Sequence, residues 1–416
     1  MRPVSAYPSQ RALQMPLLHV LAGAGGEASS RVVQDALAER FSLPGHLRTA
    51  TAEVGPGNRV NRWDRHVRWA QQRARLAGYT TSPTAGVWRL SRSGEQALGN
   101  QRRGTVVTVA VTGFGILVWA HAEDLAGVLD DGSVQLFCSS PPFPLNRRKG
   151  YANQHPARAH VEWLVRLVER YLPKLAPEGS IVLEVGPAWT PGEPTQATWM
   201  ERLVIALEDR LGLHLCQTLY WENPAKMPGP AAWTTRERVR LTDRIERLLW
   251  MAPTTRPYAD NRAVLAPYSG AMRRLLARGG EAAQRRPSGH HRTDGAFGHD
   301  NGGAIPGTLL RVANTASNDH YTRACREAGL PVHPARFPEE LPEFLIRFLT
   351  REDDLVVDPM CGSARTARAA DRLRRRWVCG DLACEYLRGA AFRLSDLPGF
   401  VSHFGPRPEA VVGRAA

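Results

Sequence analysis

At 416 residues the chain is long enough for two or three domains, and its 43% hydrophobic residues supply sizeable cores. The formal charge of +14, from 54 basic and 40 acidic residues, favours a polyanionic partner, because each neutralised phosphate releases counterions. A coding bias towards arginine is the alternative explanation. Neither a signal-peptide pattern nor a run of about 20 apolar residues occurs, so we expect a soluble, cytoplasmic protein without a membrane partner.

Cysteine and histidine spacing argues against a metal centre. The six cysteines are scattered without a CxxC pair, which favours reduced thiols. His290, His291 and His299 lie in a stretch rich in Gly, Arg and Ser, where no regular element would fix them as ligands. We therefore expect no bound metal.

The first hundred residues predict three helices followed by a strand pair. An apolar helix at 16–24 precedes a second helix that Ser29 or Ser30 caps. A third helix begins near Asn61, with apolar residues at helical spacing, and an alternating strand occupies 87–90. This order of elements is typical of a winged helix.

The winged-helix segment is strongly basic. Residues 57–103 contain ten arginines and two acids, which is the footprint of a groove-binding helix and wing. Arg62, Arg65 and Arg73 are the candidate contacts to a DNA duplex. A solvated basic face on a protein-binding winged helix is the alternative interpretation.

Residues 12–100 resemble the N-terminal domain of Mrr-type restriction proteins. The similar segments are "GGEASSRVVQDAL", "NRWDRHVRWAQQRARLAGY" and "GVWRLSRSGEQAL". The resemblance implies DNA binding and does not identify a recognition sequence.

A short buried strand at 134–137 leads into a rigid loop, Ser140-Pro141-Pro142-Phe143. The first proline forces Ser140 into an extended conformation, and the pair stiffens the turn. The loop offers a hydroxyl, carbonyls and an aromatic face, which suits gripping a flat base that carries an exocyclic amine. A basic segment with Arg147, Arg148 and Lys149 follows.

The next segment alternates helices, at 161–175 and 200–211, with strands, at 180–185 and 213–220, which indicates an α/β sheet. Residues 221–252 are predicted to form a loop followed by a basic strand pair. Residues 279–303, rich in Gly, are predicted to be a flexible insertion.

The chain becomes regular again after His333 and predicts a nucleotide-binding β-turn-α-β unit. A strand at 355–357 ends at Asp358-Pro359, a tight loop with Gly362 and Ser363 follows, and a second strand ends at Asp381. Gly362 permits close backbone approach to a ligand, and Asp381 lies where an acid binds ribose hydroxyls. Without the full GxGxxG pattern, adenosine without phosphate fits better than a dinucleotide. A helix cap and a surface strand end are the alternative roles of the two acids.

Residues 120–395 resemble the β-order N4-cytosine DNA methyltransferases. "SPPF" matches the catalytic motif of that family and "DPMCGSART" its cofactor loop, with Met360, Ala364 and Arg365 as departures. The resemblance implies a Rossmann-like methyltransferase fold with a mixed seven-stranded sheet and S-adenosylmethionine as cofactor. It implies that the cofactor contacts are Asp358, Pro359, Gly362, Ser363 and Asp381, with Phe337 and Pro338 as further candidates.

The motifs and both resemblances divide the chain into six parts. We predict a winged helix at 12–100, a linker at 101–120, a catalytic half at 121–222, a target-recognition region at 223–330, a cofactor-binding half at 331–396 and a tail at 397–416.

The implied reaction is methyl transfer to cytosine N4 in double-stranded DNA. Ser140 and the Pro141 carbonyl would accept the two amino hydrogens and Phe143 would stack on the base, which must leave the duplex. Lys226 is a further candidate for lining the base or the DNA groove. A cognate restriction endonuclease or a phage-defence role is expected by association with the family, and we expect a nucleoid-associated monomer or homodimer.

Three alternatives remain open. An N6-adenine methyltransferase on the same fold would normally carry Asp or Asn at the position of Ser140. An inactive DNA-binding regulator would not need an intact Ser140, Asp358, Gly362 and Asp381. An RNA substrate is disfavoured by the winged helix. Cys138 as a nucleophile for C5 methylation is disfavoured because it lacks the proline setting, and we expect a small core residue there.

Overall fold

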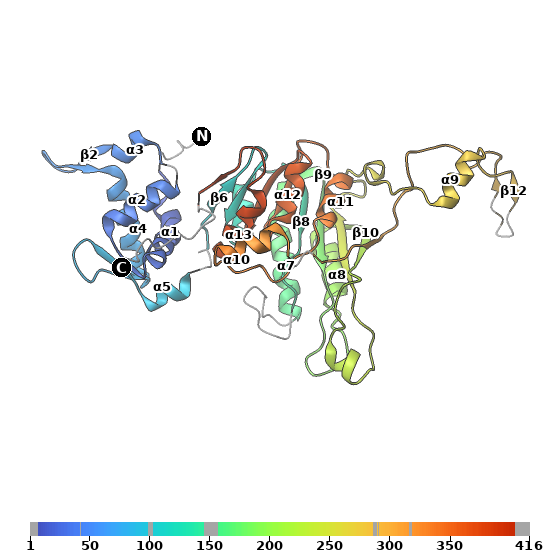
Figure 1. Ribbon diagram of the computed structural model, residues 1–416, viewed down its shortest axis with the longest axis horizontal. Helices are drawn as coiled ribbons and strands as arrows, with labels where there is room; N and C mark the ends of the chain where they lie inside the picture. Colours follow the sequence, from blue (N-terminus) through green and yellow to red (C-terminus); the bar gives the residue numbers. More distant parts are fainter. Residues whose placement is uncertain are drawn as a thin grey trace.

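The computed structural model describes residues 7–41, 43–98, 103–144, 157–285, 289, 291–315 and 318–403. In Figure 1 the N-terminal domain lies at one end and a large sheet occupies the middle of the molecule. Two projections extend from the far side of the sheet.

The N-terminal domain has the helix order that the sequence predicts. Ser29 accepts a hydrogen bond from the amide of Val32 (3.4 Å) and Asn61 from that of Asp64 (3.0 Å), so both caps are formed. Trp63 is fully buried between the helices. The main helices are α1 (Gln10–Gly23), α2 (Ser30–Arg40) and α4 (Arg62–Leu76), and the small sheet contains β1 (Glu27–Ser29), β5 (Val87–Leu90) and β4 (Thr80–Thr81).

Two features of this domain differ from the prediction. α1 begins at Gln10 rather than at Pro16, because Ser9 caps it and Pro16 is accommodated inside the helix. A short helix and a hairpin separate α2 from α4, and their short, mixed sequences carry little periodic signal. They are α3 (Gly45–Thr49), β2 (Thr51–Glu53) and β3 (Arg59–Asn61), and the domain closes with α5 (Arg92–Ala97).

The central sheet is mixed, and ten strands are described in it, in the order β14-β10-β11-β9-β8-β15-β16-β7-β6-β17. The predicted count of seven was wrong because short strands extend both ends of the sheet and residues 105–120 form two strands. The strands are β6 (Val107–Val111), β7 (Gly115–Trp119), β8 (Val134–Ser139), β9 (Leu175–Val185), β10 (His214–Glu222), β11 (Ile245–Ala252), β14 (Leu309–Arg311), β15 (Leu355–Asp358), β16 (Arg376–Asp381) and β17 (Val401–Ser402).

Helices cover both faces of this sheet, as in a doubly wound α/β fold (Figure 1). One face buries α11 (Glu340–Leu349), α12 (Arg365–Arg372) and α13 (Cys384–Leu394). The other face buries α6 (Ala122–Leu125), α7 (Ala157–Tyr171) and α8 (Trp199–Leu211). α10 (His320–Glu327) packs on α13.

Two predicted elements of the sheet region have different bounds. The helix predicted at 161–175 ends at Tyr171, because a 3-10 turn with Pro173 follows it (Leu172–Lys174). The predicted basic strand pair at 221–252 is a single strand, β11, because the Pro- and Gly-rich stretch before it forms a short helical turn (Ala232–Arg236).

The two projections come from the region between β9 and β14. Segments 187–198 and 223–244 form one of them, joined by hydrogen bonds from Trp189 (2.7 Å) and Gln196 (3.0 Å) to Asp243. The described residues between Ala266 and Ala304, which pair at the base, form the other, an extended arm in Figure 1. The arm carries α9 (Gly270–Ala277) and the two-stranded sheet of β12 (Gln284–Arg285) and β13 (His291–Arg292), so the predicted insertion at 279–303 contains regular structure.

The N-terminal domain is packed against the sheet domain. The ring of His19 in α1 meets Trp119 at the end of β7 edge to face, with 5.2 Å between centroids. Arg11 donates a hydrogen bond to the carbonyl of Arg103, and Arg103 forms an ion pair with Glu123 (2.7 Å). Burial of His19 lowers its pKa to about 3, so the ring at this junction is neutral. Arg103 therefore lies in a fixed contact between the two domains. The predicted bounds of the linker (101–120) and the tail (397–416) were wrong, because β6 and β7 lie within the first segment and β17 within the second.

Candidate active site

A cavity of about 780 Å³ opens at the carboxyl ends of the adjacent strands β9, β8, β15 and β16. Ligand sites in open α/β sheets lie at this edge, since the loops there leave the strands in different directions. The cavity brings together two predicted loops that are more than 200 residues apart in sequence. Among its lining residues are Ser140, Pro141, Pro142, Phe143, Glu184, Lys226, Glu246, Phe337, Pro359, Gly362, Ser363, Arg365 and Asp381.

The Ser140 hydroxyl lies at the end of β8 and donates a hydrogen bond to the Glu184 carboxylate. The Phe143 ring rests on Gly186, where a Cβ would lie 2.4 Å from a ring carbon, and near Trp199 (6.3 Å between centroids). A side chain at position 186 would therefore displace the Phe143 ring. These contacts hold the aromatic ring in the cavity wall, where a base can contact it.

Glu184 is a residue of this site that the sequence interpretation missed. It is 6% exposed at the end of β9, and its second carboxylate oxygen has no hydrogen-bond donor among the described residues. Burial raises the pKa of Glu184 well above its usual range, and the neighbouring Glu246 raises it further. Lys226 forms an ion pair with Glu246 at 2.6 Å. The one available signal in the sequence was that the apolar run 180–185 contains an acidic residue, although such a run predicts a buried strand.

Asp358 was predicted to contact the cofactor, but the structure places its side chain inside the protein. It is fully buried and accepts hydrogen bonds from the hydroxyls of Ser139 and Thr366, both at 2.7 Å, and from the Met360 amide (3.1 Å). Burial raises its pKa to about 6 against the effect of these bonds. Asp358 therefore ties the Ser140 loop to the Gly362 loop and does not line the cavity.

Asp381 does line the cavity, at the end of β16. One carboxylate oxygen accepts from the Gly362 amide (3.0 Å) and the other from the Ala383 amide (2.9 Å). Burial raises the pKa of Asp381, and the nearby His333 opposes that shift. Gly362 has a φ of +50°, and a Cβ there would approach the His333 ring to 3.0 Å, so glycine is needed on both counts.

The remaining predicted cofactor residues are divided between the cavity and the interior. Pro359, Ser363 and Phe337 line the cavity, whereas Pro338 is buried outside it. Of the departures from the family motif, Met360 also lines the cavity, and Ala364 has a φ of +59°, which explains why glycine is common there.

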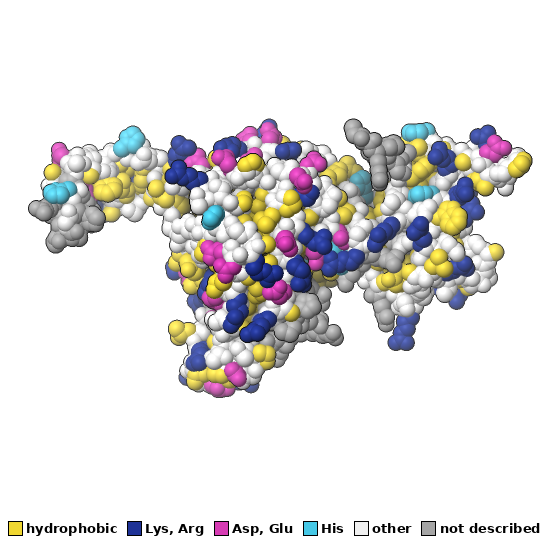
Figure 2. Space-filling model, turned by 180° about the vertical axis from the view of Figure 1, so that it is seen from behind, with side chains coloured by type: hydrophobic (Ala, Val, Ile, Leu, Met, Phe, Trp, Pro, Cys, Tyr) yellow, Lys and Arg dark blue, Asp and Glu magenta, His cyan; other side chains and the backbone are white. Residues whose placement is uncertain are grey.

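The predicted DNA contacts lie in two places. Arg62, Arg65 and Arg73 are exposed on one face of α4, together with Trp69, whose exposure is 51%. In Figure 2, which shows the molecule from behind, most of the charged side chains visible on the N-terminal domain at the right are basic. Lys226 lies in the cavity instead, near Glu246. Arg147, Arg148 and Lys149 lie outside the described residues.

Two further searches concern other kinds of site. Within the part of the chain that the structure describes, no group of three or more His, Cys, Asp and Glu side chains is placed to hold a metal ion. No helix in that part combines the length and apolar character needed to cross a lipid bilayer. Cys138 is 5% exposed, and burial raises the pKa of its thiol well above the usual range.

With this geometry in place, comparison with known proteins identifies the family. Residues 134–392 match the family model described as DNA methylase. The chain belongs to the DNA methylase family. Residues 11–100 match a second model, described as the Mrr N-terminal domain. Both predicted resemblances are therefore confirmed.

Individual relatives of this DNA methylase cover most of its sheet domain. The type II methyltransferase M.PvuII of Proteus hauseri is 38% identical over 289 residues, which is 68% of this chain and 85% of the relative. M.BglII of Bacillus subtilis is 22% identical over 66% of this chain and 68% of its own length. Among solved structures, a PvuII DNA methyltransferase described as cytosine-N4-specific has a TM-score of 0.56 at 32% identity, covering 68% of this chain and 87% of that one.

Proposed function

We propose that this DNA methylase transfers a methyl group from S-adenosylmethionine to the N4 amine of cytosine in duplex DNA. The observation that carries the proposal is the Ser140 hydroxyl, which lies in the same cavity as Asp381 and Gly362 and has Glu184 as its acceptor. The cytosine-N4 specificity printed for the similar PvuII enzyme supports the same target.

The cavity residues fit the cofactor. Asp381 presents a carboxylate at a strand end, where it would accept the two ribose hydroxyls, and Gly362 lines the cavity beside it. Pro359, Ser363 and Phe337 would form the surrounding wall. When bound, S-adenosylmethionine supplies an electrophilic methyl group on a sulfonium.

Cytosine N4 is a poor nucleophile, because its lone pair is delocalised into the ring. Ser140 Oγ would accept one amino hydrogen while its own hydroxyl donates to Glu184, and the Pro141 carbonyl would accept the other. Phe143 would stack on the flipped base, which fixes the direction of attack. The proton that N4 loses would pass to Ser140 and on to the Glu184–Glu246 pair, whose negative charge Lys226 stabilises.

We also propose the division of labour along the chain. The exposed basic face of α4 in the 12–100 domain and the two projections, to which the predicted target-recognition region 223–330 contributes, would hold the duplex around the cavity. Its Mrr-type N-terminal domain and its type II relatives support a restriction–modification setting with a cognate endonuclease, and so a nucleoid location. Protection of host DNA from a coexpressed endonuclease would test that partner.

Single-molecule sequencing of DNA from a host that expresses the chain tests the function. We expect 4-methylcytosine at one recognition sequence, lost by at least about a hundredfold in Ser140→Ala, because the amine loses a positioned acceptor. Ser133→Ala, at a half-buried serine outside the cavity that bonds the Asp130 carbonyl (2.8 Å), is the matched control and keeps full modification. Unchanged 4-methylcytosine in Ser140→Ala would disprove the assigned role.

A further inference from the structure

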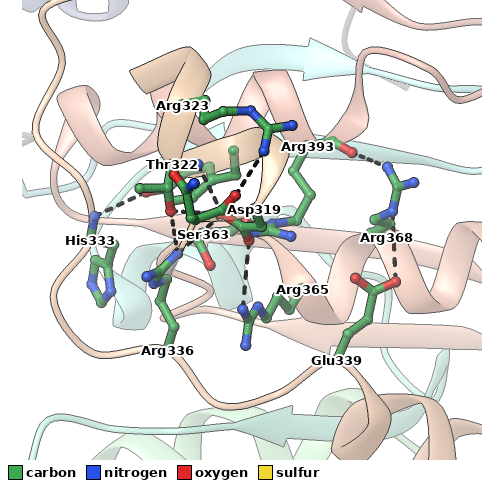
Figure 3. Close-up of polar contacts among 12 residues, drawn as sticks. Asp319, Thr322, Arg323, His333, Arg336, Glu339, Ser363, Arg365, Arg368 and Arg393 are labelled. Atoms are coloured by element: carbon green, nitrogen blue, oxygen red, sulfur yellow. Dashed lines mark hydrogen bonds and ion pairs between the residues drawn. The ribbon is translucent and has the colours of Figure 1, made fainter. Parts of the chain in front are cut away.

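A cluster of arginines surrounds one carboxylate beside the cofactor loop. Figure 3 shows Asp319 with Arg336, Arg365 and Arg393 converging on it from three elements of the chain. The guanidinium nitrogens lie 2.9 Å (Arg393), 3.5 Å (Arg336) and 3.8 Å (Arg365) from the carboxylate oxygens. Hydrogen bonds from Thr322 and Arg393 lower the pKa of Asp319 against the opposing effect of burial, so the carboxylate is charged. Three cations then face one anion.

The cluster is not solvated. Arg365 is 4% exposed and Arg393 is 9% exposed, and the Arg336 side chain is 15% exposed. Another nearby acid, Glu339, forms ion pairs with Arg368 and Arg372, both at 3.6 Å. Burial and the neighbouring arginines lower the pKa of Arg365 to about 10. Buried cations without matching anions are unfavourable, so an additional anion would stabilise the cluster.

The arginines differ in what they contact. Arg393 donates to the Ser363 carbonyl (2.9 Å) as well as to Asp319, and it does not line the cavity. Arg336 and Arg365 both line it. Arg365 donates to the Phe337 carbonyl, and its Nε is buried without a hydrogen-bond partner among the described residues. Arg365 thus has unused donor capacity next to the cavity.

We propose that Arg365, assisted by Arg336, binds the carboxylate of the amino-acid end of S-adenosylmethionine. This inference rests on the cofactor of the proposed function, and it assigns a role to a residue that departs from the family motif. Arg365 is the first residue of α12, directly after the Gly362 loop, so the helix dipole also favours an anion at this end of the helix. With the ribose at Asp381, the carboxylate would point towards Arg365 and the sulfonium towards Ser140.

The competing explanation is that Arg365 is only a structural brace. Arg365 would then only hold the Phe337 segment against α12, and its loss would weaken every ligand of the cavity equally. Two nucleosides separate the explanations. S-adenosylhomocysteine carries the amino-acid carboxylate, whereas 5′-methylthioadenosine has the same adenosine and thioether and no carboxylate.

Calorimetric titration of both nucleosides into the full chain and Arg365→Met tests the proposal. We expect S-adenosylhomocysteine to bind roughly ten- to a hundredfold more weakly to the variant, since charge-assisted hydrogen bonds are lost, and methylthioadenosine to bind as before. Arg368→Met is the matched control. Arg368 lies on the same helix, pairs with Asp396 at 2.6 Å and lies outside the cavity, so both affinities should stay within twofold.

Equal losses for the two nucleosides would overturn the carboxylate assignment and support the brace, while leaving the proposed function intact. If Arg365→Met does not fold, Arg365→Lys takes its place, with a smaller loss again expected for S-adenosylhomocysteine alone. A wild-type chain that binds neither nucleoside would overturn the cofactor assignment and this inference with it. Because no DNA is present, the outcome does not depend on which base is methylated.

Discussion

At the scale of single residues, the site depends on a hydroxyl next to a buried carboxyl pair. The sequence motif identifies Ser140, but its hydrogen-bond acceptor Glu184 lies 44 residues away on another strand. No local pattern joins the two, since parallel strands meet only through the topology of the sheet. The adjoining Glu246 and Lys226 come from still later in the chain.

Glu184→Gln keeps the side-chain shape and removes the proton acceptor. We expect the single-turnover methylation rate to fall by about 10²- to 10⁴-fold, the usual contribution of a positioned acid or base, while S-adenosylhomocysteine binding stays unchanged. Glu178→Gln, at an exposed residue of the same strand, should retain the full rate. A Glu184→Gln enzyme with wild-type rate would show that Ser140 needs no acceptor.

The pH dependence of the methylation rate follows from the neighbouring carboxyl groups of Glu184 and Glu246. Because burial and Glu246 raise the pKa of Glu184, the carboxyl gains its proton at a higher pH than an ordinary glutamate. Ser140 then loses its charged acceptor, so the rate should fall as the pH decreases through that raised pKa. Glu246→Gln removes one cause of the shift, and the acid limb of the rate profile should move to lower pH. Movement to higher pH would contradict this account.

At the scale of elements, the two loops that line the cavity are held in register by Asp358 at the end of β15. Its bonds to Ser139 and Thr366 connect β8 with α12 and so fix the spacing between the Ser140 loop and the Gly362 loop. The strand and loop were predictable from the apolar run and Gly362. The side-chain direction of Asp358 was not, because a carboxylate at a strand end can point to the ligand or into the core.

Thr366→Val tests this brace with little change in shape. The variant removes one hydroxyl that bonds the buried Asp358 carboxylate at 2.7 Å, and we expect unfolding free energy to drop by about 1–3 kcal/mol. Thr195→Val, at an exposed threonine, should change it by less than about 0.5 kcal/mol. Denaturant unfolding measures the unfolding free energy of both variants. A loss in Thr366→Val as small as that in Thr195→Val would mean that the Thr366 hydroxyl does not stabilise the fold.

At the scale of the whole molecule, the packed junction of His19 and Trp119 fixes the winged helix relative to the cavity. The sequence indicated both domains through helical spacing, basic residues and family motifs. It did not indicate their contact, nor the edge strands that enlarge the sheet, because such short elements carry no periodic signal and such contacts join distant segments. The basic face of α4 is therefore held at a set position relative to the cavity.

Arg65→Ala tests whether that face binds DNA. We expect weaker binding to all duplex sequences and a salt dependence whose slope decreases by about one, since one phosphate contact is lost. The methylation rate at saturating DNA should not change. Arg31→Ala, at an exposed α2 residue paired with Asp35 at 3.4 Å, is the control. An unchanged salt slope in Arg65→Ala would remove this face from the DNA interface.

The target base is the central claim, and nucleoside mass spectrometry tests it most directly. Duplex DNA incubated with the purified chain and S-adenosylmethionine would be digested and its methylated nucleosides identified. With Ser140 and Glu184 in the cavity, we predict N4-methyldeoxycytidine, absent from the Ser140→Ala reaction. N6-methyldeoxyadenosine as the product, or methylation that persists in Ser140→Ala, would contradict the account.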